Sequence, residues 1–249
     1  MNNSDTNDEV RAWTMVGDQR PITEFLVPVL DEPWQDRGTR VAADLARRLS
    51  LPLHFVHMSG SGEAPLSVAP ARVSTEPPDV EVRSTTIEGD DVAAVVRAVA
   101  KAGSVIVLAT DNAREWTTTQ SVGETLVRTA VDPVVLCGPN VSAGEVSGSI
   151  VVALDGSPTA EVGIGLGLSM ARSLGVSLWL AQVVDTTTSA RVRALADAGD
   201  QVSESAYLRD VVDRVESDGV DVGWEILHND DAVSGIVEFA AKQGAGLVV

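Results

Sequence analysis

Two aspartates occupy positions at which an α/β protein could contact a ligand. Asp31 and Asp155 each follow a short apolar run that is typical of a buried strand. Open α/β sheets bind ligands beyond the carboxyl ends of their strands, so either carboxylate could accept a hydrogen bond from a ligand there. Aspartate also bonds the backbone of strand-to-helix turns. For Asp155, which precedes Gly-Ser, both interpretations stay open, whereas Asp31, which precedes Glu-Pro, favours the turn.

Other motifs that carry chemistry are missing from the sequence. Neither Lys101 nor Lys242 lies in the Gly-Lys-Ser/Thr pattern of a P-loop, and no Gly-x-Ser-x-Gly nucleophile elbow occurs. His54 and His57 are three residues apart on an expected strand and therefore on opposite faces, and His228 is distant, so the histidines form no zinc pattern. We expect no catalytic residue and no metal. His57, at the ligand-facing end of its expected strand, could line a pocket, although a packed side chain is favoured.

Size and charge narrow the choice of partners. The chain has 249 residues and a net charge of −18, with 36 acidic against 18 basic side chains. Such an acidic surface repels a phosphate backbone, so nucleic acid is not an expected partner. No apolar run reaches the ~20 residues of a membrane helix, and residues 1–20 lack the basic start and apolar centre of a signal peptide. We expect a protein of the cytoplasm, and the single cysteine, Cys137, fits a reducing compartment.

One stretch contains a complete strand, helix and strand. Ile150 to Leu154 is apolar and β-branched, as expected for a strand buried on both faces. Ser157 suits a helix N-cap and Pro158 the first helical position. A helix is predicted from Ala160 to Leu174, where Gly175 ends it. A second apolar run ends at Val184. Two buried strands joined by a helix predict a parallel pair in a sheet covered on both sides.

The first half of the chain repeats this pattern. Aligning the two first strands places Asp31 opposite Asp155, and the second strands then begin at Leu53 and Leu178. The repeat predicts a flexible acidic tail at 1–20, a first domain at 21–139, a linker at 140–146 and a second domain at 147–249. Because the second copy stops at Val249, inside its expected fourth strand, we expect it to lack a last helix and strand.

The turns at the strand ends resemble those of a known family. Ala153-Leu154-Asp155-Gly156-Ser157 and Gln182-Val183-Val184-Asp185 are similar to the "VALDGS" and "HVVD" segments of universal stress protein domains. The resemblance implies two tandem flavodoxin-like, doubly wound α/β domains, each with parallel strands in the order 3-2-1-4-5.

The resemblance also implies contacts to an adenine nucleotide. In nucleotide-binding members, the acid after strand one and the residue before the end of strand two touch the adenosine. Carried over to this sequence, these positions are Asp155 and Val183 in the second copy and Asp31 and Met58 in the first.

The phosphate loop of the first copy departs from the family pattern. Binding members carry a glycine, two residues, a second glycine, nine residues, and then Gly-Ser or Gly-Thr at the start of a helix, because backbone amides close on the phosphates. Here Ala109 and Asn112 replace the first two glycines, the spacer is one residue longer, and Glu124 replaces the hydroxyl. Only Gly123 is kept, so a structural loop is favoured over a phosphate site.

Two classes of function remain. The first is a non-enzymatic stress-response regulator that forms homo-oligomers and binds a protein partner, with no required cofactor and a degenerate nucleotide site. The alternative is a protein that binds ATP, or hydrolyses it slowly, at a site in the complete second domain. The apolar strand Val134 to Cys137 is expected at a sheet edge, where an exposed strand invites pairing with a second copy.

Overall fold

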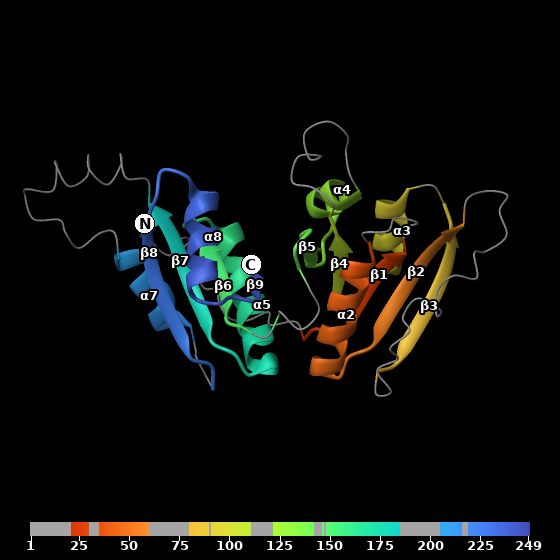
Figure 1. The fold of residues 1–249 in the computed structure, drawn as a ribbon, viewed down its shortest axis with the longest axis horizontal. Helices are drawn as coiled ribbons and strands as arrows, with labels where there is room; N and C mark the ends of the chain where they lie inside the picture. The colour runs from red at the N-terminus through yellow and green to blue at the C-terminus, as the bar shows by residue number, and fades with distance from the viewer. Residues whose placement is uncertain are drawn as a thin grey trace, which may run out of the picture. The chain divides into compact units, whose positions relative to one another are not determined.

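The computed structural model describes residues 21–29, 35–59, 80–89, 91–110, 122–141, 146, 148–184, 205–215 and 219–249. These residues fall into two compact units, which we call the N-terminal unit (within Arg20–Val146) and the C-terminal unit (within Ser147–Val249) (Figure 1). Each is built on a parallel sheet with helices against it, so the predicted α/β fold class is confirmed.

The N-terminal sheet has five parallel strands in the predicted order, β3-β2-β1-β4-β5. Its elements, in chain order, are β1 (Glu24–Val29), α2 (Gln35–Leu49), β2 (Leu53–Ser59), β3 (Val82–Glu88), α3 (Val92–Val99), β4 (Ser104–Ala109), α4 (Val122–Thr129) and β5 (Val134–Cys137). The order reverses between β1 and β4, which places the switch point at the carboxyl ends of these two strands.

The C-terminal sheet is shorter, with four parallel strands among the described residues in the order β8-β7-β6-β9. Its elements are β6 (Ile150–Leu154), α5 (Pro158–Leu174), β7 (Leu178–Val184), α7 (Ala206–Arg214), β8 (Val222–His228), α8 (Ala232–Lys242) and β9 (Leu247–Val248). Here β6 and β9 flank the switch point.

Side-chain caps fix where several helices begin. Asp91 accepts hydrogen bonds from the amides of Ala93 and Ala94 at the start of α3. Asp231 accepts one from Ser234 in α8, and Ser157 accepts one from Ala160 in α5. These contacts satisfy amides that have no partner within the helix, and the contact of Ser157 confirms the predicted cap of α5.

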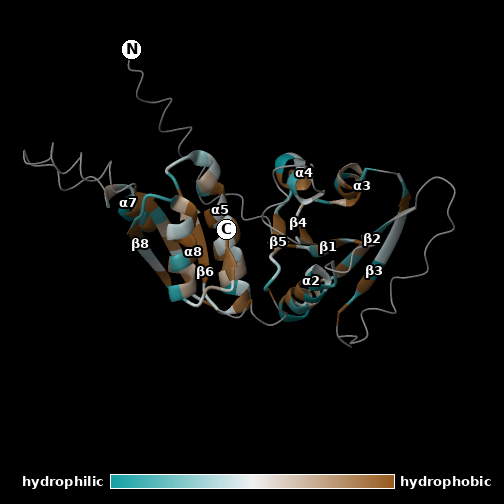
Figure 2. Cartoon of the chain, turned by 45° about the horizontal axis from the view of Figure 1, so that its top comes forward, coloured by the Kyte–Doolittle hydropathy of each residue, from teal (hydrophilic) through white to brown (hydrophobic). Residues whose placement is uncertain are grey.

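Each sheet is covered by apolar side chains from its own unit. In the N-terminal unit, α3 and α4 cover one face, and residues such as Leu26, Ile106 and Leu126 are fully buried there. In the C-terminal unit, Trp179 of β7 meets Phe239 of α8 edge to face, with ring centroids 5.7 Å apart. Figure 2 shows β6 in hydrophobic brown and α2 in mixed teal and brown, as expected for a buried strand and an amphipathic helix.

The strand registers correct the alignment of the two copies by one residue. Phe25 of β1 lies beside Leu53 and Val105, and Ile150 of β6 lies beside Leu178 and Leu247. Phe25 is therefore the counterpart of Ile150, whereas the sequence alignment had paired it with Ser149. The shift reverses which face each side chain of the first strand occupies. By these registers Asp155 corresponds to position 30 of the sequence, and Asp31 comes one residue after that position.

Candidate functional site

The carboxyl edge of the C-terminal sheet carries the first candidate, Asp155. Its Oδ1 atom accepts a hydrogen bond from the Ser157 amide at 2.8 Å, across Gly156, whose φ of +83° is in the left-handed region. The side chain is exposed, and hydrogen bonds from the Ser157 hydroxyl and amide lower the pKa of its carboxyl group. Asp155 therefore makes the turn contact that one of the two interpretations predicted.

Helix α7 contacts a second acidic group near this turn, Glu161 of α5. The Tyr207 hydroxyl donates a hydrogen bond to Glu161 Oε1 at 3.2 Å and so links α7 to the first turn of α5. Burial raises the pKa of Tyr207 to about 12, and the charge of Glu161 acts in the same direction. The charges of Arg214 and Asp155 also act on Tyr207, in opposite directions, so this edge holds two carboxylates beside one guanidinium group.

Val183, the second candidate in this unit, is packed against a helix. A Cβ added to Gly235 of α8 would lie 3.2 Å from Val183 Cγ2, so the valine side chain occupies the space that this glycine leaves. The neighbouring Gln182 points to the other face of the sheet, and its buried Oε1 atom has no hydrogen-bond partner. No pattern in the sequence predicted a role for this amide.

The N-terminal counterparts are only partly described. Asp31 lies outside the described residues, and Met58 lies in β2 beside Ile87. His57 is beside Val29, and it holds the register position of Gln182 in the other sheet. Burial lowers the pKa of His57, and its buried Nε2 atom has no hydrogen-bond partner. Both copies thus place a polar side chain at the same point on the second strand.

The residues of the degenerate phosphate loop are held by their own neighbours. Ala109 is the last residue of β4 and is buried beneath α2. Gly123 is the second residue of α4, and Glu124 Oε1 accepts a hydrogen bond from Arg128 Nε at 3.0 Å along the same helix. Asn112 lies outside the described residues. A carboxylate in the first turn suits a helix, but it would repel a phosphate there.

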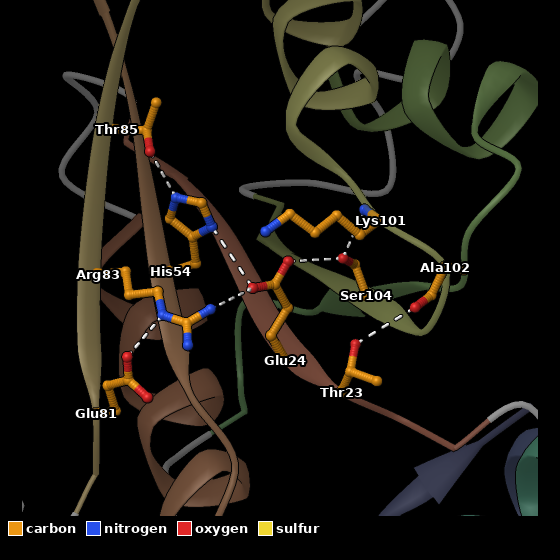
Figure 3. A network of polar contacts seen from close by, with 9 residues as sticks. All are labelled: Thr23, Glu24, His54, Glu81, Arg83, Thr85, Lys101, Ala102 and Ser104. Atoms are coloured by element: carbon orange, nitrogen blue, oxygen red, sulfur yellow. Dashed lines mark hydrogen bonds and ion pairs between the residues drawn. The ribbon is translucent and has the colours of Figure 1, made fainter.

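A buried polar network lies at the opposite, amino edge of the N-terminal sheet (Figure 3). Glu24 accepts a hydrogen bond from the Ser104 hydroxyl at 2.8 Å, and its other oxygen lies 3.6 Å from His54 Nδ1 and 3.8 Å from an Arg83 guanidinium nitrogen. The His54 Nε2 atom is 2.8 Å from the Thr85 hydroxyl. Because Ser104 bonds Glu24 and not His54, this arrangement is not a hydrolase triad.

The described residues contain no group of three or more His, Cys, Asp or Glu side chains that could hold a metal ion. In the same part of the chain, no helix is both long and apolar enough to cross a membrane.

Residues 148–249 match the universal stress protein family. No curated protein matches the chain. The predicted resemblance is thus confirmed for the universal stress protein domain of the C-terminal unit.

Several solved structures share the fold over most of this chain. A universal stress protein from Archaeoglobus fulgidus is similar with a TM-score of 0.64 and 13% identity, over 90% of this chain and 85% of that one. A putative universal stress protein from Pseudomonas aeruginosa is similar with a TM-score of 0.56 and 15% identity, over 93% of this chain and 83% of that one. The cytoplasmic domain of a prokaryotic cation chloride cotransporter is similar with a TM-score of 0.51 and 14% identity, over 90% of this chain and 93% of that one. At such low identity these likenesses concern the fold alone.

Proposed function

We propose that the chain is a tandem, non-enzymatic regulator of the universal stress protein type, acting in a cytoplasmic stress response. The observation that carries the proposal is the shared register of the two sheets. The domain at 148–249 matches the family, and the N-terminal sheet places its strands one, two and four in the same register. This shared register supports the proposed tandem organisation.

We infer that the N-terminal unit does not hold a nucleotide triphosphate. Two features support this inference. Ala109 stands, buried within β4, where the family carries a glycine, and Glu124 places a carboxylate at the start of α4. The charge repulsion acts on any phosphate that approaches the helix N-terminus.

Calorimetric titration of the full chain with Mg-ATP tests the inference. We expect no heat of binding at micromolar ATP, and a micromolar dissociation constant would contradict it. A triple variant, Ala109→Gly with Asn112→Gly and Glu124→Ser, restores the family residues. It should gain affinity only if the longer spacer can still close around the phosphates.

The alternative is ATP binding by the C-terminal unit, with Asp155 and Val183 as adenosine contacts. One observation favours it: Asp155 is exposed at the edge where the family places its ligand. If ATP binds, Asp155→Asn should weaken binding about tenfold or more, since a hydrogen bond to a charged group contributes roughly 1.5–3 kcal/mol. Asp221→Asn, at the amino edge of the same sheet, is the matched control and should leave affinity unchanged.

The proposed partner is a second copy of the chain, which meets this one through β5. Among the described strands β5 forms one edge of its sheet, and Val134, Val135 and Leu136 are only half-buried. Val131, just before the strand, is 91% exposed. Light scattering at micromolar concentration should give at least a dimer mass, and a charged variant, Val135→Lys, should shift it toward the monomer.

A further inference from the structure

An arginine joins three elements at the carboxyl edge of the N-terminal sheet. Arg37 lies in the first turn of α2, and its side chain is partly buried. One terminal guanidinium nitrogen donates to the carbonyl of Pro139 at 2.5 Å, and the other donates to the carbonyl of Thr110 at 3.2 Å. Thr110 directly follows β4, and Pro139 lies just beyond β5. A single side chain therefore holds the exits of two neighbouring strands.

The backbone beneath Arg37 holds the helix in place. A Cβ added to the next residue, Gly38, would lie 2.9 Å from the Ala109 amide nitrogen and 3.1 Å from the Leu108 carbonyl carbon. Glycine therefore lets α2 rest directly on the end of β4. The Thr110 amide also donates to the Cys137 carbonyl at 2.9 Å, which closes the ladder between β4 and β5.

The C-terminal unit also places a helix glycine against its sheet, there against side chains and without the arginine. Gly163 follows Ile150 by thirteen residues, as Gly38 follows Phe25, and it lies close to the side chains of Val249 and Val152. The residue before it is Val162, which is 66% exposed. A helix can thus pack on this sheet without a guanidinium group, so the fold alone does not require Arg37.

We propose that Arg37 is a latch that keeps the carboxyl edge of β4 and β5 closed, and that its release exposes the Cys137 thiol beneath. Two charge-assisted hydrogen bonds from one planar group hold the two strand exits at a fixed spacing. Cys137 is 2% exposed, and burial raises the pKa of its thiol to about 11, although the Arg37 charge acts in the opposite direction. The closed edge hides the thiol, and the open edge makes it reactive.

Cys137 is the only cysteine of the chain, so it reports on the latch directly. The experiment measures the rate of thiol modification by Ellman's reagent in the full native chain. Arg37→Ala should raise the rate constant about tenfold or more, since hydrogen bonds from a charged group contribute about one to two factors of ten. Arg40→Ala is the control, because Arg40 is exposed and donates to the Asp36 carbonyl within α2 itself, at 3.3 Å. Its rate should stay within about twofold of the parent.

The direction of the change separates opening from loss of charge. Removing the Arg37 charge alone disfavours the thiolate and would slow the reaction, so a faster reaction requires opening of the edge. Arg37→Lys keeps the positive charge but loses the planar guanidinium group that makes both hydrogen bonds. We expect its modification rate to lie between those of the parent and Arg37→Ala. An unchanged or slower rate in Arg37→Ala would overturn the proposal.

Denaturant separates a local opening from global unfolding. A local opening exposes little surface, so the modification rate of Arg37→Ala should change little at low urea concentrations. If that rate instead rises with urea as steeply as global unfolding does, the substitution has destabilised the whole unit and the latch is contradicted. The latch is also contradicted if Arg40→Ala raises the modification rate as much as Arg37→Ala does.

Discussion

At the scale of single residues, burial sets the protonation state of Cys137. Its thiol pKa rises to about 11 from a reference value of 9.0, mainly because the charged thiolate is desolvated. The unfolded chain loses the proton near pH 9, while the folded chain keeps it until about pH 11. The folded state therefore binds more protons in this window, and its stability falls as the pH rises.

This linkage predicts a pH effect specific to one side chain. Between pH 9 and 11, the parent protein should lose roughly 2–3 kcal/mol of unfolding free energy more than Cys137→Ala does, at 1.36 kcal/mol per pKa unit. Urea unfolding of both proteins across that range measures the difference. Parallel stability curves for the two proteins would mean that the thiol titrates normally in the folded state.

Ser104 supports a buried carboxylate within the Glu24 network. The Ser104 hydroxyl is fully buried, donates to Glu24 and accepts from the Lys101 amide at 2.9 Å. Ser104→Ala should cost roughly 2 kcal/mol of unfolding free energy, because it leaves a buried charge with one donor fewer. Ser84→Ala, at an exposed position of β3, is the control and should change little. Equal urea midpoints for the two variants would argue against this role.

At the scale of elements, a cap supports a helix too short to be stable alone. Helix α3 has only eight residues, and Asp91 satisfies two of its first amides. Asp91→Ala should lower the unfolding free energy by about 1 kcal/mol. Asp91→Asn keeps an oxygen acceptor and should retain most of the stability. Thermal unfolding of the pair tests the cap, and an equal loss in both variants would point to the charge instead.

The strands and caps were predictable because their signals are local. Apolar runs predicted β5 and β6 with their observed bounds, and Ser157 with Pro158 predicted the start of α5. The register of the first strands was not predictable in this way. A strand buried on both faces shows no alternation of polar and apolar residues, so a shift of one residue leaves its pattern unchanged.

Long-range polar contacts gave no local signal. Glu24 is an acid at the start of an apolar run, and only the fold brings it to Ser104, 80 residues away. Arg37 is a polar residue on an amphipathic helix, where a solvent-facing side chain is the usual expectation, and its partner Pro139 is 102 residues away.

At the scale of the whole molecule, the described cores belong to separate units. The cluster around Leu126 draws only on N-terminal elements, and the cluster around Phe239 draws only on C-terminal ones. Each core is assembled from strands that pair within a single sheet. We therefore predict that the two units unfold as independent cooperative transitions.

Two core substitutions test this independence. Leu126→Ala should destabilise the N-terminal unit by about 2–5 kcal/mol, and Phe239→Ala should destabilise the C-terminal unit by about 3–5 kcal/mol, through lost burial and the cavity left behind. For units of this size, each change lowers one melting temperature by roughly 10 °C or more. Scanning calorimetry should show one transition shifted and the other in place, with hydrogen exchange assigning each transition to its unit. If either substitution moves both transitions together, the units are energetically coupled and the two cores do not unfold independently.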